Sequence, residues 1–412
     1  MTSLKEQCQL AKRASRSLRT LSAEKRNAVL KAFADNIRKH QAEILQANQA
    51  DLKKAVSLSE AFQDRLMLNP ERLQAIADGI EQIAGLEDPL HNVLEDRILS
   101  SGIHLQKITV PMGVIGIIFE SRPNVSADCT ALCFKAGSAC ILKGGKDSYH
   151  SCQAIVAQMK TALAIYGIDE NAAVLAENPT HEETQAMMED RSSVDLLIPR
   201  GNKKLIQSVV EHAKVPVIET GAGVCHTYID ASADLDMALK IAVNAKCSRP
   251  SVCNAMETLL VHEKVAPAFL PLLAKEMQKR NVIIHADEKS QQIIPGLKTA
   301  DEESWSTEYN RLEMNLKIVG SVQEAIDHIE KYGTHHSECI VSASPENVKI
   351  FMDGCDSACV YHNASTRFTD GFEFGLGGEI GISTQKLHAR GPLGLKELTT
   401  YTYHLEGKGE TR

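Results

Sequence analysis

Cys253 is one of eleven cysteines in this sequence that could perform covalent chemistry. It lies in Ser-Arg-Pro-Ser-Val-Cys-Asn-Ala, residues 248–255, directly before a predicted strand. A thiolate is a strong nucleophile and also leaves readily from a thioester, so this position suits acyl transfer. Residue type alone does not separate Cys253 from the other ten of the eleven cysteines, because a cysteine is more often a small buried side chain. Cys225 and Cys247 are the near alternatives, and we predict that both are structural.

The cysteine pattern argues against disulfides and structural metal. The count is odd, no Cys-x-x-Cys is present, and the charged N-terminus lacks an apolar secretory core. These features predict reduced thiols in a cytoplasmic protein. The fifteen histidines are scattered and form no metal-binding spacing, so we expect no metal.

Two lysines follow a predicted strand in Ile-Leu-Lys-Gly-Gly-Lys, residues 141–146. The carboxyl edge of a parallel sheet is where α/β proteins bind ligands. Taken alone, Lys143 and Lys146 read as two solvated side chains. The segment is not a P-loop, since Asp147 follows Lys146, and the chain contains no G-x-G-x-x-G for a standard Rossmann phosphate turn.

Size and charge describe a globular protein of more than one domain. The chain has 412 residues, 43% hydrophobic and 24% charged, with a net charge of −8. Its 45 basic residues form no stripe, which excludes a nucleic-acid surface. The longest apolar run, 110–119, is about half a membrane span, so no membrane partner is expected.

The elements that must position these residues alternate between strands and helices. Residues 1–100 are predicted to be mainly helical, with Ser22 as an N-cap. Strands are then predicted at 114–119, 140–142, 173–175, 194–198 and 215–218, with helices at 125–135, 152–163 and 203–210. This alternation predicts a parallel sheet covered on both faces.

A second alternation predicts a second α/β domain from about residue 245. Strands are predicted at 257–261, 282–285, 317–319, 338–341 and 358–361, with helices at 265–279, 322–329 and 345–351. The polar stretch 286–310 is predicted to be a loop. Residues 398–405 alternate apolar and polar side chains, which indicates a strand that pairs outside its own domain, as in an oligomer.

Three long segments carry a family resemblance. They are residues 111–146, residues 243–262 and residues 363–401. Together they resemble the γ-glutamyl phosphate reductases (glutamate-5-semialdehyde dehydrogenases), a branch of the aldehyde dehydrogenase superfamily. The resemblance covers the whole chain, including Tyr-Gly-Thr-His at 332–335 and Val-Pro-Val-Ile at 215–218.

The resemblance implies an aldehyde-dehydrogenase-like fold of two doubly wound α/β domains and a small β-flap for oligomerisation. It assigns 1–244 to the cofactor domain, with 99–110 in the flap, and 245–362 to the catalytic domain. Residues 363–397 return to the cofactor domain, and 398–412 form the C-terminal oligomerisation strand.

The resemblance also implies site roles. Cys253 is the nucleophile and Asn124 the oxyanion-hole amide; the alternative for Asn124 is a helix N-cap after Pro123. Lys143 aligns with the lysine that reaches the adenine ribose and Gly201 with a glycine near the pyrophosphate, while Glu308 holds the nicotinamide ribose. Lys146 occupies a position where NAD-using relatives often have Glu, which favours NADP, since an ammonium attracts a 2′-phosphate.

The implied substrate is L-glutamyl 5-phosphate, reduced with NADPH to L-glutamate 5-semialdehyde in the second step of proline biosynthesis, with possible hand-over from glutamate 5-kinase. An acyl phosphate needs cations, and the guanidinium fork suits phosphate and carboxylate. The motifs offer four arginines for this role, each of which could instead form a structural ion pair: Arg122, Arg249, Arg367 and Arg390.

Two other classes of function compete. One is a hydrolytic or CoA-acylating aldehyde dehydrogenase that uses the same Cys253; the other is an inactive, aldehyde-dehydrogenase-like binding protein. Glu219 falls where hydrolytic relatives activate water, but its motif reads Ile-Glu-Thr-Gly-Ala instead of Leu-Glu-Leu-Gly-Gly. A reductase must keep water from its thioester, so we predict that Glu219 is not the general base.

Overall fold

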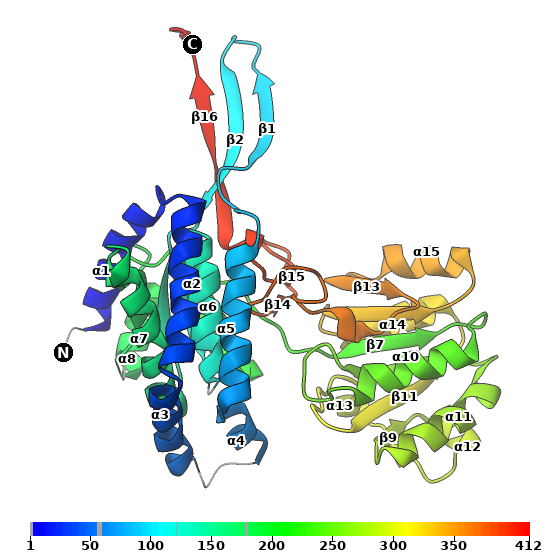
Figure 1. The fold of residues 1–412 in the computed structure, drawn as a ribbon. Helices are drawn as coiled ribbons and strands as arrows, with labels where there is room; N and C mark the ends of the chain where they lie inside the picture. Colours follow the sequence, from blue (N-terminus) through cyan, green and yellow to red (C-terminus); the bar gives the residue numbers. More distant parts are fainter. Residues whose placement is uncertain (1–2, 56–59, 121, 178–179) are drawn as a thin grey trace. The chain divides into compact units, whose positions relative to one another are not determined.

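The chain folds as two compact units, shown as a ribbon in Figure 1. The structure is a computed structural model that describes residues 3–55, 60–120, 122–177 and 180–412. Unit 1 comprises Met1–Thr220, Gly375–Gly381 and Leu393–Arg412, and unit 2 comprises Gly221–Phe374 and Ile382–Pro392. Each unit contains a parallel sheet with connecting helices, which confirms the predicted α/β class.

Helices make up the N-terminal part of unit 1. They are α1 (Leu4–Leu18), α2 (Ala23–Lys39), α3 (Gln41–Lys54), α4 (Glu60–Leu66) and α5 (Pro70–Gly85). The Ser22 side chain accepts a hydrogen bond from the Lys25 N–H and caps α2, as predicted. Leu30, Phe33 and Ile37 on α2 are fully buried, and α2 packs along α5 (Figure 1).

The parallel sheet of unit 1 has the strand order β5-β4-β3-β6. Its elements are β3 (Val114–Phe119), α6 (Pro123–Lys135), β4 (Ala139–Lys143), η1 (Lys146–Ser148), α7 (Tyr149–Ile165), η2 (Glu170–Ala172), β5 (Ala173–Leu175), α8 (His181–Glu189), β6 (Leu196–Arg200) and α9 (Lys203–His212). α6 packs with α7, and α1 packs with α8, so helices cover both faces of a sheet whose strand β3 is buried at every residue.

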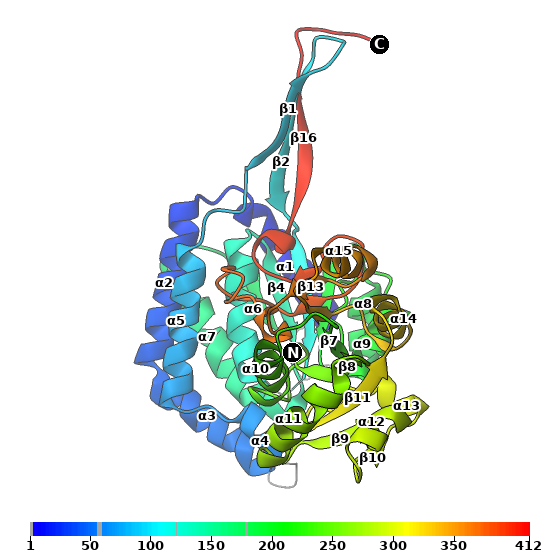
Figure 2. The ribbon, with the colours of Figure 1, turned by 90° about the vertical axis from the view of Figure 1, so that its right-hand side faces the viewer.

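An antiparallel sheet of β1 (Val93–Ile98), β2 (His104–Pro111) and β16 (Thr399–Glu406) also belongs to unit 1. We call it the arm. β16 pairs with β2 along its whole length, from Thr399↔Pro111 to Glu406↔His104, and the arm projects from the helical body of its unit in both views (Figures 1 and 2). The predicted strand at 398–405 is therefore confirmed, but its pairing outside its own domain is not, because its partner β2 belongs to the same unit. η4 (Lys396–Leu398) leads into β16.

The sheet of unit 2 is parallel throughout and has the order β10-β9-β11-β8-β7-β12-β13. Its strands are β7 (Cys225–Ile229), β8 (Met256–His262), β9 (Ile283–Ala286), β10 (Lys298–Thr299), β11 (Glu313–Val319), β12 (Ser337–Val341) and β13 (Cys359–His362). Its helices are α10 (Leu235–Cys247), α11 (Ala266–Lys279), α12 (Glu288–Ile293), α13 (Glu302–Trp305), α14 (Val322–Tyr332), α15 (Pro345–Gly354) and η3 (Thr366–Phe368). A short antiparallel pair, β14 (Ile382–Ser383) and β15 (Gly391–Pro392), completes the unit.

Alternate residues of the central strands contribute side chains to two separate hydrophobic cores. Ile229, Leu259 and Val261 pack with α10 and α11 on one face. Tyr228 and Leu260 pack with α14 and α15 on the other. This alternation follows from the two-residue period of a strand, and it explains why every residue of β8 is buried.

Four expectations from the sequence differ from the structure. No strand was predicted at 225–229, yet β7 lies between β8 and β12, and the predicted boundary near 245 falls inside α10. The predicted strand at 215–218 is reduced to one bridge between Leu197 and Val217, because Pro216 has no N–H to donate to a ladder. The stretch 286–310 contains α12, β10 and α13 instead of a continuous loop.

The described residues contain neither a candidate membrane span nor a candidate metal cluster. None of their helices is both long and apolar enough to cross a membrane. No group of three or more His, Cys, Asp or Glu side chains among them is arranged to hold a metal ion.

Candidate active site

Cys253 lies in a turn of unit 2 between α10 and β8, at the amino edge of the sheet. We call residues 248–255 the nucleophile loop. Pro250 cannot continue α10 and disfavours helix at the residue before it, and the helix ends with Ser248 as its C-cap. Cys253 itself is half-buried. A half-buried thiol at a strand edge can meet a substrate and still be held in place by its surroundings.

The two ends of the nucleophile loop are joined by a buried ion pair. Lys246 Nζ on α10 lies 2.6 Å from Glu257 Oε2 on β8, and both side chains are fully buried. Burial raises the pKa of Glu257 to about 7, although Lys246 opposes the shift. Because removing one partner would leave a buried charge unpaired, this pair fixes where the loop begins and ends.

The backbone carbonyl of Cys253 is contacted by the Cys225 thiol and lies close to Gly223. The Cys225 thiol donates to the Cys253 carbonyl oxygen at 3.2 Å, and Cys225 Sγ also lies 3.6 Å from His336 Nδ1. A Cβ on Gly223 would lie 1.5 Å from that same carbonyl oxygen, so only glycine permits this approach. Burial raises the pKa of Cys225 well above its usual value, which keeps it a neutral donor and disfavours it as a nucleophile.

The Cys247 side chain packs against the hydrophobic core of unit 2. Its sulfur lies 3.8 Å from Met277 Sδ, and it packs against the core shared by α10 and α11. Burial raises the pKa of Cys247, which disfavours the thiolate at this position.

Arg367 and Arg249 supply positive charge near the nucleophile loop. Arg367, in η3, donates from Nε to Ser248 Oγ at 3.1 Å and from Nη1 to Asn254 Oδ1. The pKa of Arg367 is lowered by burial and then by the positive charge of Arg249, while negative charge at Asp370 and Cys253 opposes the shift. Guanidinium groups stay charged in proteins, so two cations share the surroundings of Cys253.

Arg390 has an acidic partner instead. Its Nη1 lies 2.8 Å from Asp356 Oδ1, and its Nη2 donates to the Asp356 carbonyl at 2.8 Å. Lys386 and Arg390 together lower the pKa of Asp356 to about 2. The ion-pair alternative raised for Arg390 therefore describes its contacts in this structure.

Glu308 is tied to the backbone near the nucleophile loop. Its Oε1 accepts a hydrogen bond from the Gly223 N–H at 2.8 Å. The carboxylate thus lies beside the glycine that touches Cys253, on the segment between α13 and β11.

The remaining predicted residues lie at the carboxyl edge of the sheet in unit 1. The parallel register pairs Ile118 with Lys143 and Phe119 with Arg200. The segments that follow β3, β4 and β6 therefore leave the sheet at the same edge. They carry Arg122, Asn124, Lys143, Lys146 and Gly201; Ser121 lies outside the described residues.

The two lysines differ in environment. Lys143 ends β4 and is half-buried, and both burial and the charge of Lys146 lower its pKa. Lys146 is exposed at the start of η1. Two ammonium groups close together at the carboxyl edge of a sheet produce a local positive charge that would favour an anion.

Gly201 lies where the chain turns from β6 into α9. A Cβ there would lie 2.7 Å from Leu205 Cδ2 and 2.9 Å from Glu120 Cδ. Asn202 caps α9 and donates from Nδ2 to Glu120 Oε1 at 2.6 Å. Glu120 was not singled out from the sequence, although it begins the Glu-Ser-Arg-Pro-Asn segment. The close backbone approach and the adjacent lysines fit a phosphate-bearing cofactor at this edge.

Asn124 is not a helix N-cap, so that alternative is wrong. Arg122 is the N-cap of α6 and Pro123 the first helical residue, because the fixed φ of proline suits that position. Asn124 Nδ2 donates to Asp128 Oδ2 at 3.2 Å. Burial raises the pKa of Asp128 to about 6, with Asn124 and Arg200 opposing the shift. Asp128 was not singled out from the sequence, because no motif marks it.

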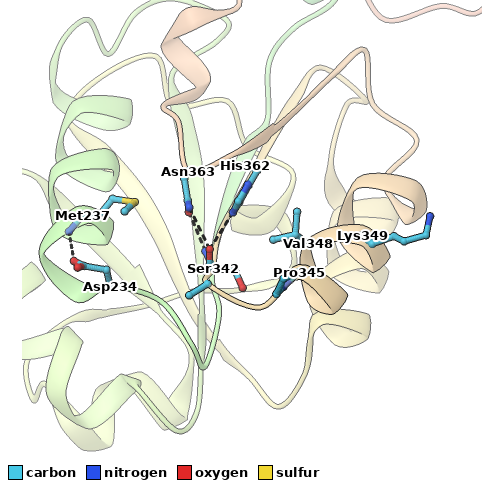
Figure 3. Close-up of a pocket in the computed structure, with 9 residues that line it drawn as sticks. Asp234, Met237, Ser342, Pro345, Val348, Lys349, His362 and Asn363 are labelled. Atoms are coloured by element: carbon cyan, nitrogen blue, oxygen red, sulfur yellow. Dashed lines mark hydrogen bonds between the residues drawn. The ribbon is translucent and has the colours of Figure 1, made fainter.

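A separate pocket of about 420 Å³ lies in unit 2 at the opposite edge of the sheet from Cys253. It follows the carboxyl ends of β12 and β13 (Figure 3), where the Asn363 side chain accepts from the Ser342 N–H at 3.0 Å and donates to the Ser342 carbonyl at 3.2 Å. The predicted site residues are not part of its lining, which is Asp234, Met237, Ser342, Ala343, Pro345, Val348, Lys349, His362 and Asn363.

Comparison with known proteins identifies the class. The aldehyde dehydrogenase family model matches residues 2–305, and an engineered glycolyl-CoA reductase with bound NADP⁺ has the same fold, with a TM-score of 0.70 at 17% identity over 98% of this chain and 96% of that chain. The chain therefore belongs to the aldehyde dehydrogenase family.

The particular branch follows from closer relatives. The chain is 48% identical to a γ-glutamyl phosphate reductase of Lactiplantibacillus plantarum over 100% of both chains. The crystal structure of a γ-glutamyl phosphate reductase from Thermotoga maritima superposes with a TM-score of 0.97 at 42% identity, again over 100% of both chains. Within its superfamily the chain belongs to the γ-glutamyl phosphate reductases, which confirms the resemblance drawn from its motifs.

Proposed function

We propose that this chain reduces L-glutamyl 5-phosphate to L-glutamate 5-semialdehyde with NADPH and releases phosphate, as the second step of proline biosynthesis. The observation that carries the proposal is the half-buried Cys253 beside Arg367 and Arg249, in a chain related over its full length to γ-glutamyl phosphate reductases. A nucleophilic sulfur with two neighbouring cations suits an acyl phosphate.

The proposed reaction proceeds through a thioester on Cys253. The Cys253 thiolate attacks the acyl carbon, the bond from that carbon to the phosphate oxygen breaks, and phosphate leaves with the electron pair. A bound nicotinamide cofactor would provide the hydride needed to reduce this thioester. The carbon–sulfur bond of the resulting hemithioacetal then breaks, which restores the thiolate and releases the aldehyde. The Asn124 amide is proposed to donate to the oxyanion in both additions.

The cofactor assignment rests on unit 1. Lys143 is proposed to reach the adenine ribose and Lys146 the 2′-phosphate, with Gly201 at the pyrophosphate and Glu308 of unit 2 at the nicotinamide ribose. The paired lysines and the close backbone at Gly201 support this assignment. Arg122, Arg249 and Arg367 remain candidates for the substrate anions, whereas Arg390 already pairs with Asp356.

Lys146→Glu is expected to weaken NADPH binding far more than NADH binding. A charge-assisted contact to phosphate contributes about 1.5–3 kcal/mol, roughly one to two decades of affinity, and charge reversal adds repulsion. Titration of both cofactors by fluorescence measures the preference. Lys31→Glu on α2, which is exposed, makes the same charge change away from this edge and controls for it. If Lys146→Glu leaves the ratio of NADPH affinity to NADH affinity unchanged, Lys146 does not contact the cofactor.

Glu219→Gln is expected to retain phosphate-dependent oxidation of glutamate 5-semialdehyde within about tenfold. Glu219 is a half-buried residue near the end of the first segment of unit 1, Met1–Thr220. Phosphate is already an anionic nucleophile that needs little base assistance. Lost general-base catalysis would cost about 10²–10⁴-fold. A loss beyond a hundredfold, with NADPH binding intact, would assign Glu219 a proton-transfer role and support the hydrolytic alternative.

One assay separates the competing functions. NADPH oxidation is followed with glutamate 5-kinase supplying the acyl phosphate, and the reverse reaction is followed with phosphate, CoA or water as the acceptor. Activity with phosphate alone supports the proposal. Activity with CoA or water favours the other dehydrogenases, and no activity with any acceptor favours a binding protein.

We also propose that the arm joins copies of this chain into a homo-oligomer. Its strands expose a set of large apolar side chains: Val93, Leu94, Ile98, Tyr401, Tyr403 and Leu405. Exposed apolar groups on an edge strand indicate an interaction surface, and light scattering on the full chain tests it. Cytoplasmic location and hand-over from the kinase remain predictions.

A further inference from the structure

Asn254, the residue after the nucleophile, binds the segment that carries Arg367. Its carbonyl accepts from Thr366 Oγ1 at 2.7 Å, its Oδ1 accepts from Arg367 Nη1, and its Nδ2 donates to the Thr369 carbonyl at 2.7 Å. Asn254 is 3% exposed. The turn formed by η3 is thereby fastened to the nucleophile loop, although the two segments are more than a hundred residues apart in the chain.

Arg367 has a second anchor on the same loop. Ser248 Oγ, at the end of α10, accepts from Arg367 Nε at 3.1 Å. A guanidinium carries five N–H groups in a fixed plane, and these two bonds set the orientation of that plane. The other N–H groups can then meet an anion at a defined place.

We propose that Asn254 is a positioning residue, which holds the Arg367 guanidinium at a fixed place relative to Cys253 Sγ so that Arg367 meets the phosphoryl group of the substrate. This inference rests on the proposed function. The phosphate is bonded through one of its oxygens to the carbon that Cys253 attacks, whereas the α-carboxylate is four carbons away. A cation fastened to the residue next to the nucleophile therefore meets the phosphoryl group.

The chemistry of the amide explains why this position carries asparagine. A neutral amide accepts from Arg367 and donates to the Thr369 carbonyl at the same time. Aspartate would keep the first bond, but it would lose the second and place a negative charge beside the incoming dianion. Alanine would lose both bonds and leave the guanidinium without its anchor on the residue next to Cys253.

A double-mutant cycle on Asn254→Ala and Arg367→Ala tests the coupling. In phosphate-dependent oxidation of glutamate 5-semialdehyde, Asn254→Ala is expected to raise KM for phosphate about ten- to a hundredfold, with a smaller change in kcat. The double variant should then match Arg367→Ala within about threefold, since Asn254 acts through Arg367. If the two effects multiply instead, Asn254 has only an independent structural role and the proposal is overturned.

A second measurement needs no turnover. Cys253 alkylation by iodoacetate, an anion, and by neutral iodoacetamide is quantified by mass spectrometry. The ratio of the two rates reports positive charge near the sulfur, and it should fall about tenfold in Arg367→Ala. Asn254→Ala should lower the ratio in the same direction, and Asn254→Asp at least as far. A wild-type ratio in Asn254→Ala overturns the positioning role, whereas absence of phosphate-dependent activity in the wild type would instead count against the proposed function.

Ser248→Ala provides a variant that is safe for folding. Ser248 is exposed, and the substitution removes the bond to Arg367 Nε without touching Asn254. A smaller fall in the alkylation ratio is expected. Ser306→Ala, an exposed C-cap of α13, is the matched control and should keep the wild-type ratio. If Asn254→Ala is insoluble, Ser248→Ala decides the test, and an unchanged ratio there overturns the fixed placement of Arg367.

Discussion

Cys253→Ala is expected to abolish turnover while NADPH still binds. The thiolate forms the covalent bond to the substrate, and no neighbouring group can replace it, because burial keeps the nearby Cys225 thiol protonated. The coupled kinase assay measures NADPH oxidation, and fluorescence titration measures cofactor binding. Residual activity above a few per cent would show that Cys253 is not the nucleophile.

Cys247→Ala is the matched control, six residues earlier and also half-buried. Its sulfur packs against Met277 Sδ, so we expect a modest loss of stability and retained activity. Together the two variants separate loss of a nucleophile from loss of a thiol. An inactive Cys247→Ala enzyme with an intact fold would reopen the choice between the two cysteines.

Gly223→Ala is expected to lower kcat by more than about a hundredfold, by displacing the nucleophile without removing it. The new Cβ would lie 1.5 Å from the Cys253 carbonyl oxygen and 2.9 Å from its Cα, so the backbone of the nucleophile loop must shift. A misplacement of about 1 Å at a reacting group costs roughly 10²-fold. Overpacking also costs about 1–3 kcal/mol of stability, which thermal unfolding measures alongside the rate.

Gly320→Ala is the control for a glycine-to-alanine change that does not displace the nucleophile loop. A Cβ on Gly320 meets only side-chain oxygens at 3.4 Å or beyond, and this glycine also lies in unit 2. It should therefore keep wild-type kcat. Near-normal kcat in a folded Gly223→Ala enzyme would contradict the close contact between Gly223 and the Cys253 carbonyl.

Local patterns predicted most of the regular structure. The apolar period and the Ser22 cap specified α2, and the predicted strand at 257–261 lies within β8. β7 was missed because Cys-His-Thr-Tyr-Ile contains polar residues in a central, fully buried strand. Those polar groups are tolerated only because distant partners bind them, as Glu338 binds the ring and the N–H of His226.

The sequence by itself determined the family, the fold class and the kinds of residue available for the chemistry: a cysteine before a strand, paired lysines after another, and arginines in long matching motifs. Only the tertiary structure decided which of these side chains share an environment. In the folded chain Arg390 forms an ion pair with Asp356, and Arg367 donates a hydrogen bond to Asn254. Gly223 lies in close contact with the carbonyl of Cys253. Elements form from interactions a few residues apart, which a sequence displays. These contacts join segments from 30 to more than a hundred residues apart, and such pairings exist only once the sheet order and the packing of the loops at its edge are set.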